Sequence, residues 1–452
     1  MTQTFSRSFS PDSHTNQVVR KQAKPFTGEK KELDSLMDLI GESNYVLIGE
    51  ASHGTHEYYR TRIDLTKRLI EERGFNVVAA EADWPDAWLV NRYVKDQGTA
   101  GSAMEALSGF QRFPTWLWRN ADVLSFVEWL KQYNQTIVHY DKKVGFYGLD
   151  LYSLYRSAAA VIDYLMPFNP EAAERARHRY ECLSTFGRDE QRYGYAASLG
   201  LTKTCEEKVL AELIELKRVE AELLQRDGRV ASDEYFFAEQ NARVVAKAQA
   251  YYREMFMGRI NTWNLRDAHM VETLLGLDEH MHEHGQKMKA VVWAHNSHLG
   301  DARATQMSAR GEFNVGQLLR QRFANACKSI GFTGYAGTVT AASSWGGVAE
   351  RKIVRPGIMG SYEELFHKID LPSFVLNLQA PELVSVLKHP RLERAIGVLY
   401  LPETERISHY FFSELPRQFD AVIHFQDTLA VEPLERTAKW IAGEDRADET
   451  ID

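Results

Sequence analysis

Apolar runs that end abruptly in histidine or glutamate are the feature of this sequence that most constrains its fold. Each run has about the length of a buried strand, and polar residues follow it. In an open α/β sheet, the carboxyl ends of parallel strands meet along one edge, where binding and catalytic sites are built. Three strands that end in this way indicate an enzyme. They are residues 45–48, followed by Glu50 and His53; residues 75–80, followed by Glu81; and residues 289–294, followed by His295.

Strand-like runs alternate with helical patterns early in the chain and return after a long gap. This order predicts a mainly parallel sheet with helices on both faces. We expect an α/β fold whose mainly parallel central sheet is flanked by helices and carries a large helical insertion. The expected strands are residues 45–48, 76–80, 144–149, 289–293, 328–335, 373–376, 395–400 and 421–425, and the first expected helices are residues 58–70, 84–95 and 117–133.

The same pattern divides the chain into parts. Residues 31–153 and 285–440 form the predicted catalytic core. Between them, residues 154–284 show helical periodicity without a strand pattern, so we expect a helical insertion that forms a wall or lid of the site. Residues 1–30 are polar and are expected to form a flexible arm, and residues 441–452 an acidic tail.

Composition and charge argue against several partners and compartments. The formal net charge is −8 with no basic run, which argues against nucleic acid. No apolar stretch reaches the ~18 residues of a membrane-spanning helix, and residues 1–24 lack the apolar core of a secretory signal. The three cysteines are widely spaced and odd in number, so we expect no disulfide framework, no cysteine-based metal site and a cytoplasmic location.

The motifs of several common enzyme classes are missing. The chain has no G-x-S-x-G elbow, no Walker loop, no G-x-G-x-x-G and no H-E-x-x-H. If the chemistry is hydrolytic, it must therefore depend on activated water and not on a serine or cysteine nucleophile.

His53 is the predicted general base, because an imidazole titrates near neutral pH and can take a proton from water. Glu50 precedes it by three residues and is expected to orient the ring, whereas a buried histidine that caps the next helix is the alternative. His56 is a candidate for substrate binding, although His56 and Glu57 also fit the first turn of that helix, where a carboxylate favours the dipole. Arg62 lies on the same helix face as His53; it either binds a carboxylate or oxyanion or is an ordinary surface arginine.

Glu81 ends a strand of apolar and small residues, where an unpaired carboxylate would be costly. We expect it to hold a histidine or to act as a second acid or base. Asp83 is better explained as the N-cap of the following helix.

The second histidine cluster holds His295 and His298. Either could be an acid, an oxyanion donor or a metal ligand; His295 is favoured as the catalytic one because it lies nearer the strand end, and His298 is assigned to substrate binding. Arg266, beside Asp267 in a helical segment, either polarises a substrate carbonyl or belongs to a salt-bridged pair.

These residues together resemble the erythromycin esterase family. The motif G-E-A-S-H-G-T-H-E at residues 49–57, Glu81, the Arg266-Asp267 helix and the segment W-A-H-N-S-H at residues 293–298 occur in the order typical of that family. The resemblance runs from about residue 35 to residue 435. It implies an α/β core with added helices and the opening of macrolide lactones by water, without a cofactor or metal, which is a route to antibiotic resistance. The site residues that it implies are His53 as the base, with Glu50, Glu81, Arg62, His295 and His298.

The expected function is therefore hydrolysis of a small-molecule ester or macrolactone. The main alternative is a metal-dependent hydrolase, since four histidines with Glu50 and Glu81 exceed the needs of one tetrahedral zinc site. The Tiki-type metalloproteases, which use a similar G-x-x-H motif and glutamates, keep that alternative open. A ligand-binding homologue without turnover is the third hypothesis.

Overall fold

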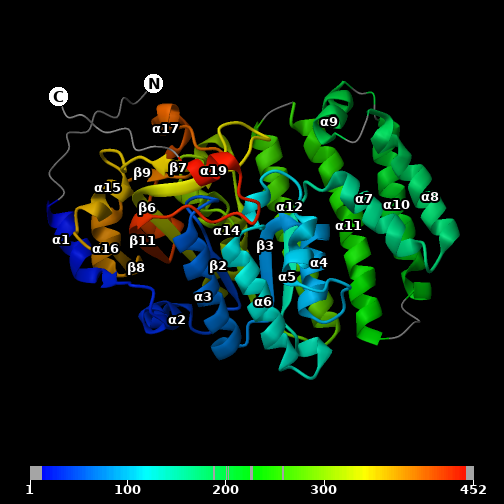
Figure 1. Ribbon diagram of the computed structural model, residues 1–452, viewed down its shortest axis with the longest axis horizontal. Coiled ribbons are helices and arrows are strands. Elements are labelled where there is room, and N and C mark those ends of the chain that lie inside the picture. The colour runs from blue at the N-terminus through cyan, green and yellow to red at the C-terminus, as the bar shows by residue number, and fades with distance from the viewer. Residues whose placement is uncertain are drawn as a thin grey trace.

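The fold is built on one large mixed sheet (Figure 1). A computed structural model describes residues 13–443, apart from residues 187–188, 200, 202, 224–227 and 257–258. Six neighbouring strands of the sheet are parallel, and antiparallel strands lie at one edge and against the end of β6. The parallel strands are, in sheet order, β11 (Ala421–Thr428), β6 (Cys327–Ala341), β2 (Tyr45–Ile48), β5 (Ala290–Trp293), β3 (Val77–Asp83) and β4 (Gly145–Asp150); the antiparallel ones are β8 (Ser373–Asn377), β1 (Lys24–Pro25) and β7 (Glu350–Val354). The predicted α/β fold with a mainly parallel central sheet is confirmed.

The apolar strands are continuous runs because helices cover both faces of the sheet. Along β2, Val46 and Ile48 face one cluster of buried side chains, and Tyr45 and Leu47 face the other. The first cluster includes side chains of α2 (Asp34–Ile40), α3 (His56–Arg73), α5 (Ala103–Ala106) and α6 (Ala121–Gln135), and the second those of α12 (Arg259–Glu283) and α14 (Val315–Phe323), while α4 (Trp84–Val94) contributes to both.

Between residues 154 and 283 the described residues form helices joined by turns and contain no strand, as the sequence pattern predicted. Five of these helices stand side by side beyond α4, at the right of Figure 1, and enclose an apolar cluster of their own. They are α7 (Leu154–Leu165), α8 (Pro170–Tyr180), α9 (Glu190–Ser198), α10 (Lys203–Leu223) and α11 (Gly228–Glu254). The next helix, α12, packs against the sheet and brings Trp263 and Arg266 to the site.

The chain before β2 is more ordered than the expected flexible arm. Residues Ser13–Gln22 form α1, whose Val19 is fully buried against β8 and its neighbouring helices, and β1 pairs with β8. The expectation of a loose arm is therefore wrong for residues 13–25, because one apolar side chain and a strand pairing anchor them. Residues 1–12 and most of the expected acidic tail, residues 444–452, lie outside the described residues.

The predicted strand at residues 395–400 is also wrong. The strand there is β9 (Arg391–Arg394), which pairs with β10 (Tyr410–Ser413) in a separate two-stranded sheet. The apolar residues after β9 pass the carboxyl end of β2, where Ile396 donates its N–H to the carbonyl of Ala51 (2.8 Å). Short helices complete this region: α13 (Asn296–Leu299), α15 (Tyr362–His367), α16 (Pro381–Leu387), α17 (Glu405–Ser408), α18 (Leu415–Gln418) and α19 (Ala438–Ala442).

Two of the three cysteines are joined. Cys182 and Cys205 form a disulfide within the helical insertion, and Cys327 is buried and free. The expectation of no disulfide is therefore wrong, and the cysteine pattern no longer supports a reducing compartment. In the described part of the chain, no helix is both long and apolar enough to cross a membrane.

Candidate active site

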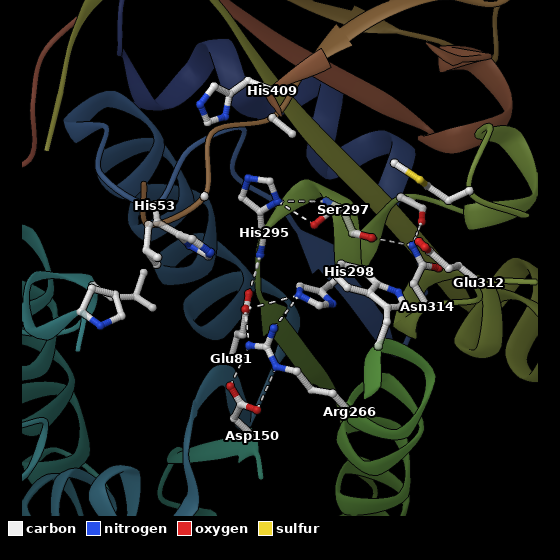
Figure 2. A pocket seen from close by; sticks show the side chains of 18 of the residues that line it. His53, Glu81, Asp150, Arg266, His295, Ser297, His298, Glu312, Asn314 and His409 are labelled. Carbon is white, nitrogen blue, oxygen red and sulfur yellow. Dashed lines mark hydrogen bonds and ion pairs between the residues drawn. The ribbon is translucent and has the colours of Figure 1, made fainter. Parts of the chain in front are cut away.

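A cavity of about 450 Å³ opens at the carboxyl ends of β2, β5, β3 and β4 (Figure 2). The parallel pairing of these strands brings His53, Glu81 and His295 to it from three separate parts of the chain. The convergence that the strand ends predicted is therefore present in the fold.

Glu50 holds the ring of His53. The Nδ1 of His53 lies 2.8 Å from Glu50 Oε1, and both residues are buried. Because a carboxylate accepts hydrogen bonds, neutral His53 carries its proton on Nδ1 and has its lone pair on Nε2. His53 lines the cavity, so this lone pair is suited to take a proton from water there.

Arg62 does not face the cavity. Its guanidinium is fully buried behind Glu50, with Nη2 3.3 Å from Glu50 Oε2. The rings of Tyr59 and Trp293 flank it at 4.7 and 4.8 Å. The prediction that Arg62 binds substrate is contradicted. His53 precedes helix α3, which begins at His56, and the face of α3 that carries Arg62 packs into the core beside Glu50.

His56 is also absent from the cavity wall. Its Nδ1 lies 2.8 Å from Asp122 of α6, which raises the pKa of the imidazole through that hydrogen bond. Glu57 accepts the N–H of Leu429. The structure thus favours the helix-terminal explanation of both residues over substrate binding by His56.

His295 has the opposite arrangement to His53. It is the N-cap of α13, and the Ser297 N–H donates to its Nδ1 at 3.2 Å. A backbone N–H can only donate, and the Ser297 hydroxyl, 2.8 Å from the same nitrogen, can donate as well, so we infer that the proton of neutral His295 is on Nε2. This Nε2 is buried, and the ring interacts with the backbone of Ala51. Burial first, then the neighbouring His53, lower the pKa of His295 to about 3, which keeps the ring neutral. The two rings are 4.8 Å apart.

Glu81 is fully engaged by its neighbours. Its Oε2 accepts the backbone N–H of His295 at 2.9 Å, and its Oε1 lies 2.5 Å from Arg266 Nη2 and 3.4 Å from His298 Nε2. Burial opposes ionisation, but His298 and Arg266 hold the pKa of Glu81 well below its usual range. Arg266 also donates twice to Asp150, at 3.0 and 2.7 Å (Figure 2).

His298 is held on both ring nitrogens. Its Nδ1 lies 2.8 Å from Asp267 Oδ1, and its Nε2 lies 3.0 Å from Arg266 Nη1. Trp263 stacks on the ring at 4.4 Å with a 7° tilt. Although burial opposes it, Asp267 and Glu81 raise the pKa of His298. Arg266 and Asp267 therefore belong to a wider ion-pair network and not to one isolated pair.

Sequence reasoning missed part of this network. Asp150 is the last residue of β4, and Glu81 follows the apolar residues of β3. A carboxylate at the end of an apolar run was therefore visible in the sequence at Asp150 as well. Asp83 occupies the expected N-cap position but makes no cap hydrogen bond; instead it pairs with Arg112 at 2.8 and 3.1 Å. Arg112 lies in a loop, where no periodic pattern marks it.

The remaining wall is largely apolar and comes from several loops. Its aromatic and aliphatic members include Phe110, Phe113, Leu117, Trp118, Trp345, Val398 and Ile407. In the described part of the chain, no three histidine, cysteine or carboxylate side chains are placed so that they could hold a metal ion.

Among the comparisons with known proteins, a sequence profile identifies the family. A sequence profile described as erythromycin esterase matches residues 70–428. YbfO of Bacillus subtilis (strain 168), named as a hydrolase without a stated substrate, is 21% identical over 92% of each chain. Erythromycin esterase type II of Escherichia coli is 22% identical over 68% of this chain and 72% of its own. A solved structure of a mutant erythromycin esterase, EreC, in its open conformation has a TM-score of 0.64 at 18% identity, covering 90% of this chain and 96% of that one.

Proposed function

Because the chain belongs to the erythromycin esterase family, we propose that it is a hydrolase that opens an ester or macrolactone by attack of an activated water. Family membership supports a hydrolase of the esterase kind. The finer assignment depends on how the two cavity histidines are held.

The observation that carries this proposal is that the Nδ1 atoms of His53 and His295 have opposite hydrogen-bond partners, a carboxylate and a backbone N–H, from which opposite tautomers follow. One ring offers a lone pair at Nε2 and its neighbour offers an Nε2–H, with ring centres 4.8 Å apart. A lone pair next to a donor is what hydrolysis of an ester requires: a base for the water and a donor for the oxygen that becomes negative.

In the proposed reaction, His53 Nε2 takes a proton as the water oxygen bonds to the carbonyl carbon. The carbonyl oxygen becomes an oxyanion, to which the His295 Nε2–H donates. When the carbon–oxygen ester bond breaks, the proton on His53 passes to the leaving alkoxide. Glu50 stabilises the imidazolium of His53 during this cycle, since it lies 2.8 Å from Nδ1.

The other predicted site residues are proposed to position this pair. Glu81 fixes the backbone of His295, and Arg266 neutralises Glu81 and Asp150. His298 has both ring nitrogens occupied, so it is a poor proton acceptor for water. Arg62 fixes Glu50 from behind.

Macrolides are the first substrates to test, because a relative that is 22% identical is named an erythromycin esterase. A panel of macrolides and simple esters is incubated with protein treated with a chelator and analysed by mass spectrometry. A product one water heavier supports a metal-independent hydrolase. Activity that disappears with the chelator and returns with zinc would support the metal-dependent alternative. Binding without any product would support a ligand-binding homologue.

A further inference from the structure

A second cavity, of about 530 Å³, lies behind one wall of the active site and is rich in positive charge. The chain as a whole has a formal net charge of −8, so an excess of cations in one place is a local feature. Four cations and two carboxylates line this second cavity: Arg303, Arg320, Lys328 and Arg417, and Asp301 and Asp420.

Two short segments separate the second cavity from the active site. Residues 300–303 line the two cavities in alternation: Gly300 and Ala302 line the active site, and the other two line the second cavity. Gln418 and Arg417 divide in the same way, with Gln418 at the active site. The N–H of the residue after Gly300 donates to the carbonyl of Gln418 at 3.0 Å, which joins the two segments. The second cavity is therefore distinct from the site proposed for hydrolysis.

The two carboxylates hold two of the arginines at this cavity. Arg303 donates from Nε and Nη2 to Asp301, at 2.9 and 2.6 Å. Arg320 donates from Nη2 to Asp420 Oδ2 at 3.0 Å, and the same oxygen accepts the N–H of Ser329 at 2.8 Å. Because a guanidinium has five N–H groups, each arginine keeps donors that its carboxylate does not use.

Lys328 and Arg417 supply the excess positive charge. The Lys328 Nζ lies 3.9 Å from Asp420 Oδ1, and among the described residues no acceptor makes a hydrogen bond with it. Its side chain is only 21% exposed. Arg417 pairs at 2.9 Å with Glu414, which is not part of the cavity lining. A largely buried ammonium group without a hydrogen-bond acceptor is stabilised by an anion that enters the cavity and accepts its protons.

A phosphate group suits this arrangement of donors. The four cations belong to four segments, namely the turn at Arg303, α14, β6 and α18, so they can approach an anion from several directions. A tetrahedral oxyanion uses such donors better than a flat carboxylate does. Arginine bonds phosphate oxygens in pairs, and lysine adds a compact charge. The volume lies within the range of small-molecule sites, about 300–1,000 Å³, which leaves room for an organic group on the phosphate.

We propose that the second cavity binds a phosphate group, either as free phosphate or as the phosphate of a small phosphomonoester. Lys328 and Arg417 supply the charge that is not balanced within the cavity, and Arg303 and Arg320 supply further N–H donors. This binding site goes beyond the proposed hydrolase and does not depend on it, because no residue of the catalytic pair lines it.

Calorimetric titration of the full chain tests the proposal with three probes. Inorganic phosphate and phenyl phosphate are largely doubly charged at about pH 8, since the second pKa of a phosphate monoester is about 6. Trimethyl phosphate has the same tetrahedral centre without a charge. We expect saturable binding of one phosphate or phenyl phosphate per chain and no binding of trimethyl phosphate. Tighter binding of phenyl phosphate would support a phosphomonoester as the ligand, and equal affinities would support free phosphate.

Substitutions place the bound anion in the second cavity. Lys328→Gln should weaken phosphate binding at least about tenfold, because hydrogen bonds to charged groups are among the stronger ones. Arg417→Gln should weaken it as well, and this side chain is 60% exposed, so the fold should tolerate the change. Lys142→Gln is the matched control: it removes the same charge from a side chain that is 67% exposed, just before β4 at the other edge of the sheet. His53→Ala should bind phosphate as the wild type does, since His53 lines the other cavity.

Three results would overturn the proposal. The first is the absence of saturable phosphate binding to the wild-type protein. The second is binding that both Lys328→Gln and Arg417→Gln retain, with circular dichroism showing that the variants are folded. The third is equal weakening in Lys142→Gln, which would indicate a general attraction of anions to the surface. None of these results depends on whether the protein cleaves an ester.

Discussion

Replacing Glu50 with glutamine should destabilise the protein far more than the loss of a surface charge would. Glu50 and Arg62 are 1% and 0% exposed, and none of the three side-chain nitrogens of Arg62 makes a hydrogen bond within the described residues. Without the Glu50 charge, no carboxylate among the described residues pairs with the guanidinium, and the rings of Tyr59 and Trp293 flank it. Removal of one member of a buried ion pair costs about 3–5 kcal/mol, and we expect Glu50→Gln to fall in that range.

A double-mutant cycle isolates the pair from other effects of each substitution. Arg62→Met should cost a similar amount alone, because it leaves the Glu50 charge buried. The double variant leaves neither charge behind, so its cost should be well below the sum of the two, with a coupling energy of about 2–3 kcal/mol. Urea unfolding followed by circular dichroism gives each free energy of unfolding, provided that the slopes agree among variants.

The same helix offers a control pair. Arg68 and Glu72 of α3 form an ion pair in which the Glu72 side chain is 45% exposed. Because water screens such a pair, the corresponding cycle with Arg68→Met and Glu72→Gln should give a coupling energy below about 1 kcal/mol. Additive costs for Glu50→Gln and Arg62→Met, or a coupling no larger than in the control, would refute the argument that Arg62 is there to hold Glu50.

Three further predictions address the base, a buried histidine and the disulfide. His53→Ala should lower kcat for any ester that the protein cleaves by ~100- to 10,000-fold while circular dichroism stays native, and near-normal turnover would remove His53 from the mechanism. His424 is buried and its pKa is lowered to about 3, chiefly by burial; the unfolded chain therefore binds the proton more readily, and stability falls as pH drops from about 6.5 toward 3. His424→Gln should flatten this acid slope of the free energy of unfolding by up to about 1.4 kcal/mol per pH unit, and an unchanged slope would contradict the prediction. Cys182 and Cys205 are 23 residues apart, so replacing both with serine should cost about 3 kcal/mol in urea unfolding; a loss below about 1 kcal/mol would contradict this loop-entropy estimate.

Strand ends were the part of the site that the sequence predicted well. The runs before Glu50, Glu81 and His295 became β2, β3 and β5, because a parallel sheet covered on both faces demands continuous apolar strands. The carboxyl ends of parallel strands must then lie along one edge of the sheet, independently of the conformation of the loops. The family resemblance was confirmed by the match over residues 70–428.

The direction in which individual side chains point could not be predicted from the sequence. Helical periodicity placed Arg62 on the face of His53, but whether that face meets the cavity or the core depends on where α3 packs. Pairing was equally hidden: Arg112 lies in a loop without periodicity, and only the fold reveals that it pairs with Asp83. The disulfide depends on the approach of two insertion helices, which spacing along the chain does not encode.

The sheet itself sets the distance between the two proposed catalytic histidines. Neighbouring strands β2 and β5 pair Ile48 with Trp293, so the loops that follow start one strand spacing apart, which is about 4.8 Å. The loops stay together because Asn296 donates its N–H to the carbonyl of Glu50 at 2.8 Å. That approach requires glycine at position 49, since a Cβ there would collide with the Asn296 side chain. Glu50 thus joins the two loops through its backbone and orients His53 through its carboxylate, which explains why one short motif contains both the glycine and the glutamate.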